Sequence, residues 1–90
     1  MYKVLRILIL KDQNTNAELM ERILYKEGIS FLSRRVETKE DFQRELKVFA
    51  PDFILSDYKL PLFDGSSALV IAKEHCPDVP FIFVPGFITI

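Results

Sequence analysis

Apolar blocks alternate with polar segments along the whole chain, and the spacing within these blocks predicts alternating strands and helices. Nearly continuous runs of branched and aromatic residues are typical of strands buried in a parallel sheet. Apolar residues spaced three and four apart are typical of helices with one buried face. We expect strands at 4–10, 29–36, 53–55 and 79–84.

Three helices are expected between these strands. The first begins near Thr15, which stands three residues before a glutamate in the arrangement of a capping box, and it ends at Gly28. The second begins near Thr38, and Pro51 closes it because proline cannot continue a helix. The third covers residues 66–74. Each predicted helix therefore connects two predicted strands.

This alternation predicts the α/β class, with a parallel sheet and right-handed crossovers. The second strand carries Arg34 and Arg35, so we expect it at or near a sheet edge with both arginines in solvent. The 90 residues contain no internal repeat, linker or low-complexity segment, and they predict a single domain.

The predicted core is rich in phenylalanine. Five phenylalanines are expected in it: 42, 49, 53, 81 and 83. Cys76 is expected to be a small buried apolar residue without a redox role. His75 lies in the last turn of the third predicted helix, where a positive charge favours the negative end of the helix dipole.

Composition restricts the class of protein. The chain is 49% hydrophobic and 28% charged, as in soluble globular proteins and unlike disordered segments. Its 12 Lys and Arg against 13 Asp and Glu give a net charge of -1, so neither nucleic acid nor a membrane is an expected direct partner. The single cysteine cannot form an internal disulfide, and the apolar run near the N-terminus is too short for a secretory signal or a membrane span. The expected compartment is the cytoplasm.

Two acidic residues stand where predicted strands end, Asp12 after the first strand and Asp57 after the third. The carboxyl ends of parallel strands share one rim, which is where open α/β sheets bind ligands. Two carboxylates there would repel each other unless a cation lay between them, and oxygen ligands suit Mg²⁺, with the Lys59 carbonyl as a third ligand. Such a site can prepare a carboxylate to attack a phosphoryl donor. Solvated turn residues are the alternative.

Two segments of the chain resemble the receiver domains of response regulators in two-component signalling. They are residues 54–61, followed by Asp64 and Gly65, and residues 7–12, followed by Asn14 and a helix. The resemblance extends over essentially the whole chain. It implies a flavodoxin-like doubly wound parallel sheet in the strand order 2-1-3-4, truncated after the fourth strand. Residues 1–90 would then form one receiver-like domain without the family's last helix, strand and helix.

The resemblance also implies roles for individual residues. Asp57 would accept a phosphoryl group from a histidine kinase or phosphotransfer protein. Mg²⁺ would be held by Asp12, by Asp57 and by the main-chain carbonyl of Lys59. Members of this family act as switches that a partner reads, so the chain is expected to be a signalling module and not an enzyme.

Two residues depart from the family pattern. Lys11 stands where the family has an acidic residue, so Mg²⁺ affinity is expected to fall. Its ammonium group either is solvated or reaches Asp57 and replaces part of the metal's charge, and we favour the solvated position. Pro85 stands where the family has a Ser or Thr whose hydroxyl bonds the phosphoryl group, and proline has no hydroxyl.

The alternative function is that of a non-phosphorylated pseudo-receiver or fragment that serves as an interaction or oligomerisation module. Without a fifth strand, Phe81–Val84 would be a hydrophobic edge that can pair with another chain. We therefore predict self-association through Phe81–Val84 or through the tail Phe87–Ile90. A carboxylate-nucleophile phosphatase is disfavoured, because Lys59 stands where those enzymes have a second Asp.

Overall fold

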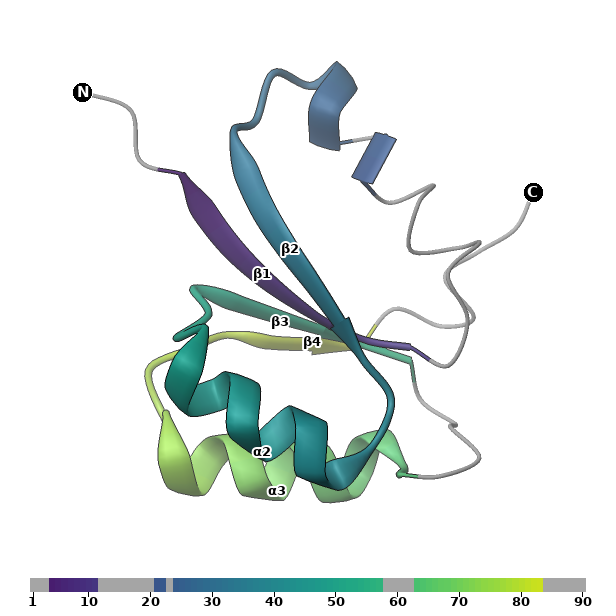
Figure 1. Cartoon of the computed structure of the whole chain (residues 1–90), viewed down its shortest axis with the longest axis vertical. Coiled ribbons are helices and arrows are strands. Elements are labelled where there is room, and N and C mark those ends of the chain that lie inside the picture. Colours follow the sequence, from purple (N-terminus) through teal and green to yellow (C-terminus); the bar gives the residue numbers. More distant parts are fainter. Residues whose placement is uncertain (1–3, 12–20, 23, 58–62, 84–90) are drawn as a thin grey trace.

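The computed structural model describes residues 4–11, 21–22, 24–57 and 63–83. Its strands all run parallel in one sheet of order β2-β1-β3-β4 (Figure 1). They are β1 (Leu5–Leu10), β2 (Phe31–Val36), β3 (Phe53–Ser56) and β4 (Phe81–Phe83). The predicted α/β class and the strand order 2-1-3-4 are confirmed.

Two helices, α2 (Lys39–Val48) and α3 (Gly65–His75), lie side by side on one face of the sheet (Figure 1). Thr38 caps α2, because its hydroxyl oxygen accepts a hydrogen bond from the Asp41 amide at 3.2 Å. The predicted start of this helix is confirmed. The helix ends at Val48, three residues before Pro51.

The described part of the first predicted helix ends as expected. Residues 24–26 are helical, and Gly28 has a φ of 77°, a left-handed conformation that glycine adopts without steric cost. The Gly28 amide donates to the carbonyl three residues earlier at 3.0 Å, and the Ile29 amide donates to the carbonyl five residues earlier at 3.1 Å. These two bonds form the Schellman motif that satisfies a helix C-terminus. The predicted start at Thr15 lies outside the described residues.

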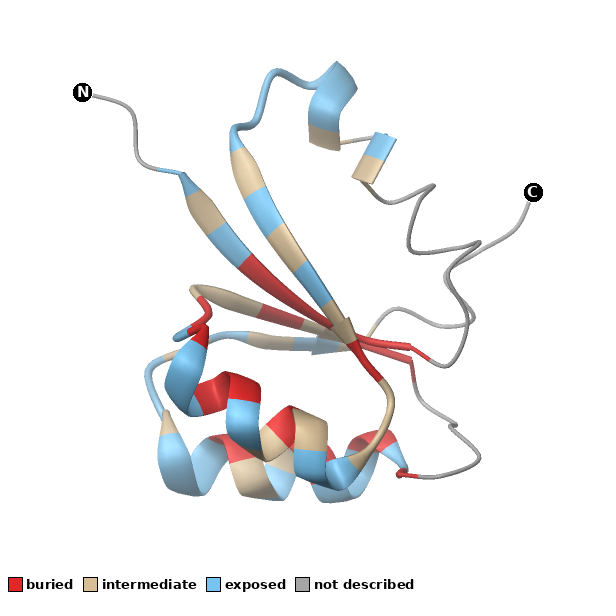
Figure 2. Cartoon of the chain, viewed as in Figure 1, coloured by how far each residue is buried: buried red, intermediate tan, exposed pale blue. Residues whose placement is uncertain are grey.

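Residues 7–10 of β1 are buried on both faces, which explains their continuous apolar sequence (Figure 2). Its side chains alternate, so Leu8 and Leu10 pack toward α2 and α3 while Ile7 and Ile9 pack on the other face. The core under the two helices also contains Val36, Phe42, Leu46, Phe49, Ile54, Phe63, Ala68 and Ala72. The other face adds the partly buried Leu5, Leu24, Phe31, Phe53 and Leu55.

The fourth strand is shorter than the predicted 79–84. The Val79 amide donates to the Cys76 carbonyl at 3.1 Å, so Val79 belongs to the turn after α3. Pro80 has no N–H to contribute to a sheet, and the regular strand begins at Phe81. The end of the predicted strand, at Val84, lies outside the described residues.

Three further expectations are corrected by the structure. The second strand begins at Phe31 and not at residue 29. Cys76 is half-buried, although it does pack against the core. Of the five expected core phenylalanines, two are buried, Phe42 and Phe49, and three are half-buried, Phe53, Phe81 and Phe83.

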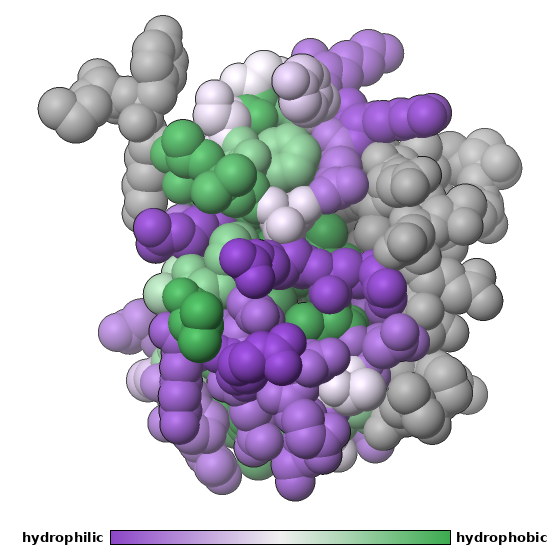
Figure 3. All heavy atoms as spheres, in the orientation of Figure 1, coloured by the Kyte–Doolittle hydropathy of each residue, from purple (hydrophilic) through white to green (hydrophobic). Residues whose placement is uncertain are grey.

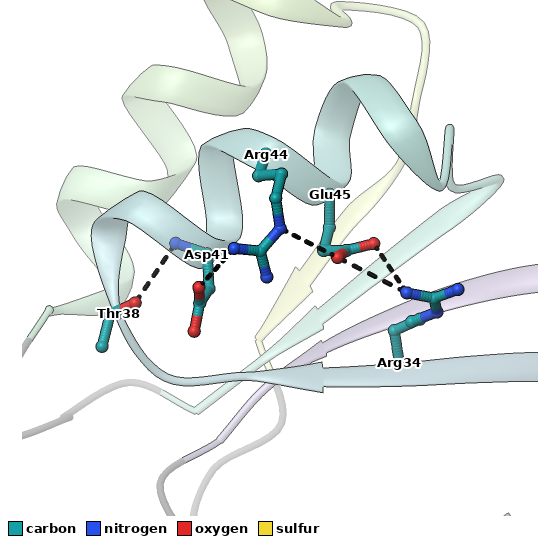
Figure 4. Close-up of polar contacts among 5 residues, drawn as sticks. All are labelled: Arg34, Thr38, Asp41, Arg44 and Glu45. Carbon is teal, nitrogen blue, oxygen red and sulfur yellow. Dashed lines mark hydrogen bonds and ion pairs between the residues drawn. The ribbon is translucent and has the colours of Figure 1, made fainter.

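A network of charged side chains joins β2 to α2 (Figure 4). Arg34 Nη1 lies 3.3 Å from Glu45 Oε1, and Arg44 Nε lies 3.3 Å from Glu45 Oε2. The Glu45 side chain is only 6% exposed, so two guanidinium groups compensate a buried carboxylate. The Arg34 guanidinium also lies over the Phe49 ring, 5.3 Å from its centroid. Arg34 is 55% exposed on an edge strand, as expected, and it also pairs with the buried Glu45.

Apolar surface gathers near the N-terminal ends of β1 and β2 in the view of Figure 3. A cavity of about 390 Å³ lies at this end. Its lining consists of Val4, Tyr25, Gly28, Ile29, Ser30 and Phe31. This end is opposite to the C-terminal strand ends. Among the described residues, no helix is both long enough and apolar enough to cross a membrane.

Candidate functional site

The C-terminal ends of β1 and β3 bring Lys11 and Asp57 together. The two strands are paired in parallel, and Leu10 lies opposite Ser56 at the last paired position. Lys11 and Asp57 are the next residues on each strand, so they lie side by side just beyond the last paired position. This is the rim of the sheet at which α/β proteins bind ligands. The Asp57 amide donates to the Leu10 carbonyl at 3.0 Å, which continues the pairing beyond the strand end.

Lys11 Nζ lies 2.8 Å from Asp57 Oδ2, at the distance of a hydrogen-bonded ion pair. The Lys11 side chain is 10% exposed and the Asp57 side chain 12%. The favoured expectation of a solvated Lys11 is therefore wrong, and the alternative, in which its ammonium reaches Asp57, is confirmed. The physical reason is that the β1–β3 register directs both side chains to the same face, where a buried carboxylate needs a counter-charge.

Backbone hydrogen bonds fix Lys11 at the end of β1. Its amide donates to the Val36 carbonyl of β2 at 3.0 Å. Its own carbonyl accepts a bond from Arg35 Nη1 at 2.8 Å. Arg35, expected in solvent, is therefore half-buried beside the site, with Glu37 3.7 Å from its guanidinium. Sequence reasoning missed Arg35, since only the β1–β2 pairing places it next to Lys11.

The start of α3 closes the site from the other side. Asp64 caps this helix by accepting a hydrogen bond from the Ser67 amide at 2.8 Å. Gly65, the first residue of α3, is buried against the main chain at the C-terminal end of β3. A Cβ atom on Gly65 would lie 2.7 Å from the Asp57 carbonyl oxygen, closer than real Cβ atoms come. Glycine is required here because the helix and the strand end touch.

The fully buried Ser56 adds a further polar contact at the same place. Its hydroxyl donates to the Asp57 carbonyl oxygen at 2.7 Å. That carbonyl oxygen therefore has a hydrogen-bond partner at a buried position. The hydrogen bond helps to hold the main chain of Asp57 where its side chain meets Lys11.

Two of the three predicted Mg²⁺ ligands, Asp12 and Lys59, lie outside the described residues, as does Pro85. Asp57, the predicted ligand that is described, already accepts a hydrogen bond from an ammonium group through its Oδ2. In the described part of the chain no group of three or more His, Cys, Asp or Glu could hold a metal ion. The ligand atoms of the described residues alone therefore do not fit a divalent cation.

A second cavity, of about 290 Å³, lies on the sheet face opposite α2 and α3. Its lining consists entirely of apolar residues, namely Leu5, Ile7, Leu24, Ile29, Phe53, Leu55 and Ile82. It offers no group for acid, base or metal chemistry. Among the described residues, the rim with Lys11 and Asp57 is therefore the better candidate for the functional site.

Comparison with known proteins gives one curated relative. The DNA-binding transcriptional regulator NtrC of Proteus hauseri is 34% identical over 76 residues, which span 84% of this chain and 16% of that protein. The chain thus corresponds to a small part of this relative's length. No family model matches the chain.

Solved structures with the same fold include several receiver domains. A protein described as a response regulator, from Chloroflexus aurantiacus, matches with a TM-score of 0.76 and 26% identity over 90% of this chain and 66% of that chain. The receiver domain of the sensor histidine kinase PA1611 from Pseudomonas aeruginosa matches with a TM-score of 0.73 and 28% identity, over the same shares. That structure has a magnesium ion coordinated in its active-site cleft.

The N-terminal domain of a response regulator receiver protein from Methanoculleus marisnigri, at 20% identity and a TM-score of 0.74, supports the fold alone. The sequence match to a curated regulator and the structural matches above 25% identity agree with each other. The chain belongs to the response-regulator receiver domains.

Proposed function

We propose that this receiver domain accepts a phosphoryl group on Asp57. The observation that carries the proposal is the position of Asp57, at the C-terminal end of a central strand and hydrogen-bonded to a cation through Oδ2. An attacking carboxylate needs a fixed position and a nearby positive charge to offset the charge of the incoming phosphoryl group. Both conditions are met among the described residues.

The phosphodonor that fits this chemistry is a phosphohistidine on a histidine kinase or a phosphotransfer protein. An oxygen of Asp57 forms a bond to phosphorus while the P–N bond to the donor imidazole breaks. The leaving imidazole takes up a proton from water, and Asp57 becomes an acyl phosphate. The Lys11 ammonium, 2.8 Å from Oδ2, is placed to offset negative charge on the transferring group.

Mg²⁺ is the cofactor that family membership supports, since the PA1611 receiver domain has this ion in its cleft. In this chain Asp12, Asp57 and the Lys59 carbonyl would hold it, and it would supply charge neutralisation to the transferring phosphoryl group. We expect weak binding, because the described donors alone do not fit the ion. The reaction above is therefore written through the residues of the chain only.

The receiver module acts as a switch for a partner and not as a turnover enzyme in this proposal. We also propose that the domain self-associates through β4, because β4 is an edge strand of the described sheet. The DNA binding named for the Proteus relative belongs to that protein, and the chain matches only 16% of its length. The net charge of -1 does not favour direct DNA contact by this domain.

Incubation with acetyl phosphate and MgCl₂, followed by intact-mass measurement, tests the acceptor. The expected result is a single phosphate adduct on the wild-type chain that is absent from Asp57→Ala. Asp78→Ala is the control, because Asp78 is exposed in the turn between α3 and β4 and is not part of the site. It should keep the adduct.

The alternative, a non-phosphorylated pseudo-receiver, makes the opposite prediction for the same measurement. No adduct on the wild-type chain, at acetyl phosphate concentrations that label another receiver domain in parallel, would reject the acceptor role. An adduct that persists in Asp57→Ala would assign phosphorylation to a different side chain.

A further inference from the structure

We propose that Lys11 is the resident cation of the Asp57 site and that it competes with any divalent ion for the same carboxylate oxygen. This inference rests on the proposed function only in naming Asp57 as the acceptor. The competition itself concerns the two side chains seen in the structure. Lys11 Nζ donates to Asp57 Oδ2 at 2.8 Å, so the oxygen that a metal would approach already has a positively charged partner.

The burial of the pair is the first reason why Lys11 would resist displacement. Both side chains are about nine-tenths buried, at 10% and 12% exposure. A buried ammonium that loses its carboxylate has lost the partner that compensates its desolvation. A divalent ion that binds Asp57 must therefore drive the ammonium out toward water, and this cost is subtracted from the ion's affinity.

The backbone contacts of Lys11 are the second reason. Its amide is held by Val36, and its carbonyl oxygen accepts from the Arg35 guanidinium at 2.8 Å. The residue therefore cannot move away as part of a loose loop. Only the side-chain torsions of Lys11 can take its ammonium away from Asp57.

Charge gives the third reason. Lys11 and Asp57 together have no net charge, whereas divalent-cation sites normally gain their affinity from excess carboxylate. At about 3 Å a like charge repels an incoming cation strongly when solvent is excluded. Lys11 thus supplies one positive charge that is always present, whereas a divalent ion would supply two positive charges and could dissociate. The site should therefore bind Mg²⁺ only at high concentrations of the ion.

Titration with MgCl₂, followed by NMR of the backbone amides around Asp57, tests the competition without any phosphorylation step. Lys11→Met keeps most of the aliphatic stem and removes the charge, and Lys11→Asp replaces the charge by its opposite. Affinity should rise in the order wild type, Lys11→Met, Lys11→Asp, with at least about a tenfold gain for the last. Lys47→Met, at an exposed position of α2, is the matched control and should behave as wild type.

Equal Mg²⁺ affinities for the wild type and Lys11→Met, both measured on folded protein, would overturn the proposal. The wild-type chain alone gives a second test, which holds even if a variant fails to fold. Saturation of its Asp57 amide shift well below about 1 mM Mg²⁺ would contradict competition by Lys11. The two proposals can fail separately. If Asp57 is not phosphorylated but the Mg²⁺ affinities follow the expected order, the acceptor role is rejected and the competition by Lys11 is supported.

Discussion

The Asp57 carbonyl oxygen occupies the space into which a side chain on Gly65 would have to project. A Cβ atom at Gly65 would lie 2.7 Å from this oxygen and 2.6 Å from Cε1 of Phe83. The oxygen belongs to the main chain, so it cannot move without moving the end of β3. This contact couples the start of α3 to the position of Asp57.

Gly65→Ala should therefore destabilise the domain by about 1–3 kcal/mol through overpacking. It should also move the backbone amide resonance of Asp57. Ser66→Ala is the control, because Ser66 is exposed in the same helical turn and its change should stay within about 0.5 kcal/mol. Urea unfolding and a two-dimensional amide spectrum measure both effects. A Gly65→Ala protein as stable as Ser66→Ala would contradict the close approach.

The Lys11–Asp57 pair should show strong coupling in a double-mutant cycle. Either Lys11→Met or Asp57→Asn alone leaves one buried group without its charged partner and should cost about 3 kcal/mol of unfolding free energy. The double variant should lose less than the sum of the two. Additive losses, measured by urea unfolding, would show that the two side chains do not interact in solution.

The fold could be predicted from the sequence because its main signals are local. The continuous apolar run at 4–10 and the capping threonine at Thr38 both predicted elements that the structure contains. The fourth strand was predicted too long, since its apolar pattern extends through a turn. The chain becomes a strand only after Pro80, where β3 offers hydrogen-bond partners.

The site was harder to predict than the fold. Asp57 could be placed at a strand end from the sequence alone, but the partner of its carboxylate could not be chosen. The choice depends on the register that sets Leu10 opposite Ser56, and this is a property of strand pairing. Burial of Lys11 follows from that register. From the sequence alone, solvation of Lys11 and a contact with Asp57 were both possible, and solvation was favoured.

Glu45 should contribute more to stability than the arginines that surround it. Its side chain is 6% exposed, whereas those of Arg34 and Arg44 are 55% and 56% exposed. Glu45→Ala should cost about 1–3 kcal/mol, partly because Arg34 loses its partner. Arg34→Met should cost less than Glu45→Ala, since Arg44 still pairs with Glu45 Oε2 at 3.3 Å. Chemical denaturation distinguishes the two, and equal losses would contradict the burial argument.

Burial raises the pKa of the Cys76 thiol, which should make it slow to react. The thiol form is favoured in the folded state, so this group's contribution to stability is complete below its ordinary pKa and is lost as pH rises through the raised value. Iodoacetamide should therefore label the folded chain more slowly than the urea-unfolded chain. Unfolding free energy should fall more steeply at alkaline pH than in Cys76→Ala. Identical slopes would contradict the raised pKa.

The edge that β4 forms in the described sheet should allow two copies of the chain to associate. Ile82 is 42% exposed on this edge strand, and a lysine there should discourage pairing with another chain. Sedimentation velocity of the wild type should give an average mass that rises with concentration, and Ile82→Lys should shift it toward the monomer. Leu32→Lys is the matched control, because Leu32 is 56% exposed on β2 at the opposite edge. A wild-type chain that remains monomeric at the highest soluble concentration, or an equal effect of both lysines, would rule out association through β4.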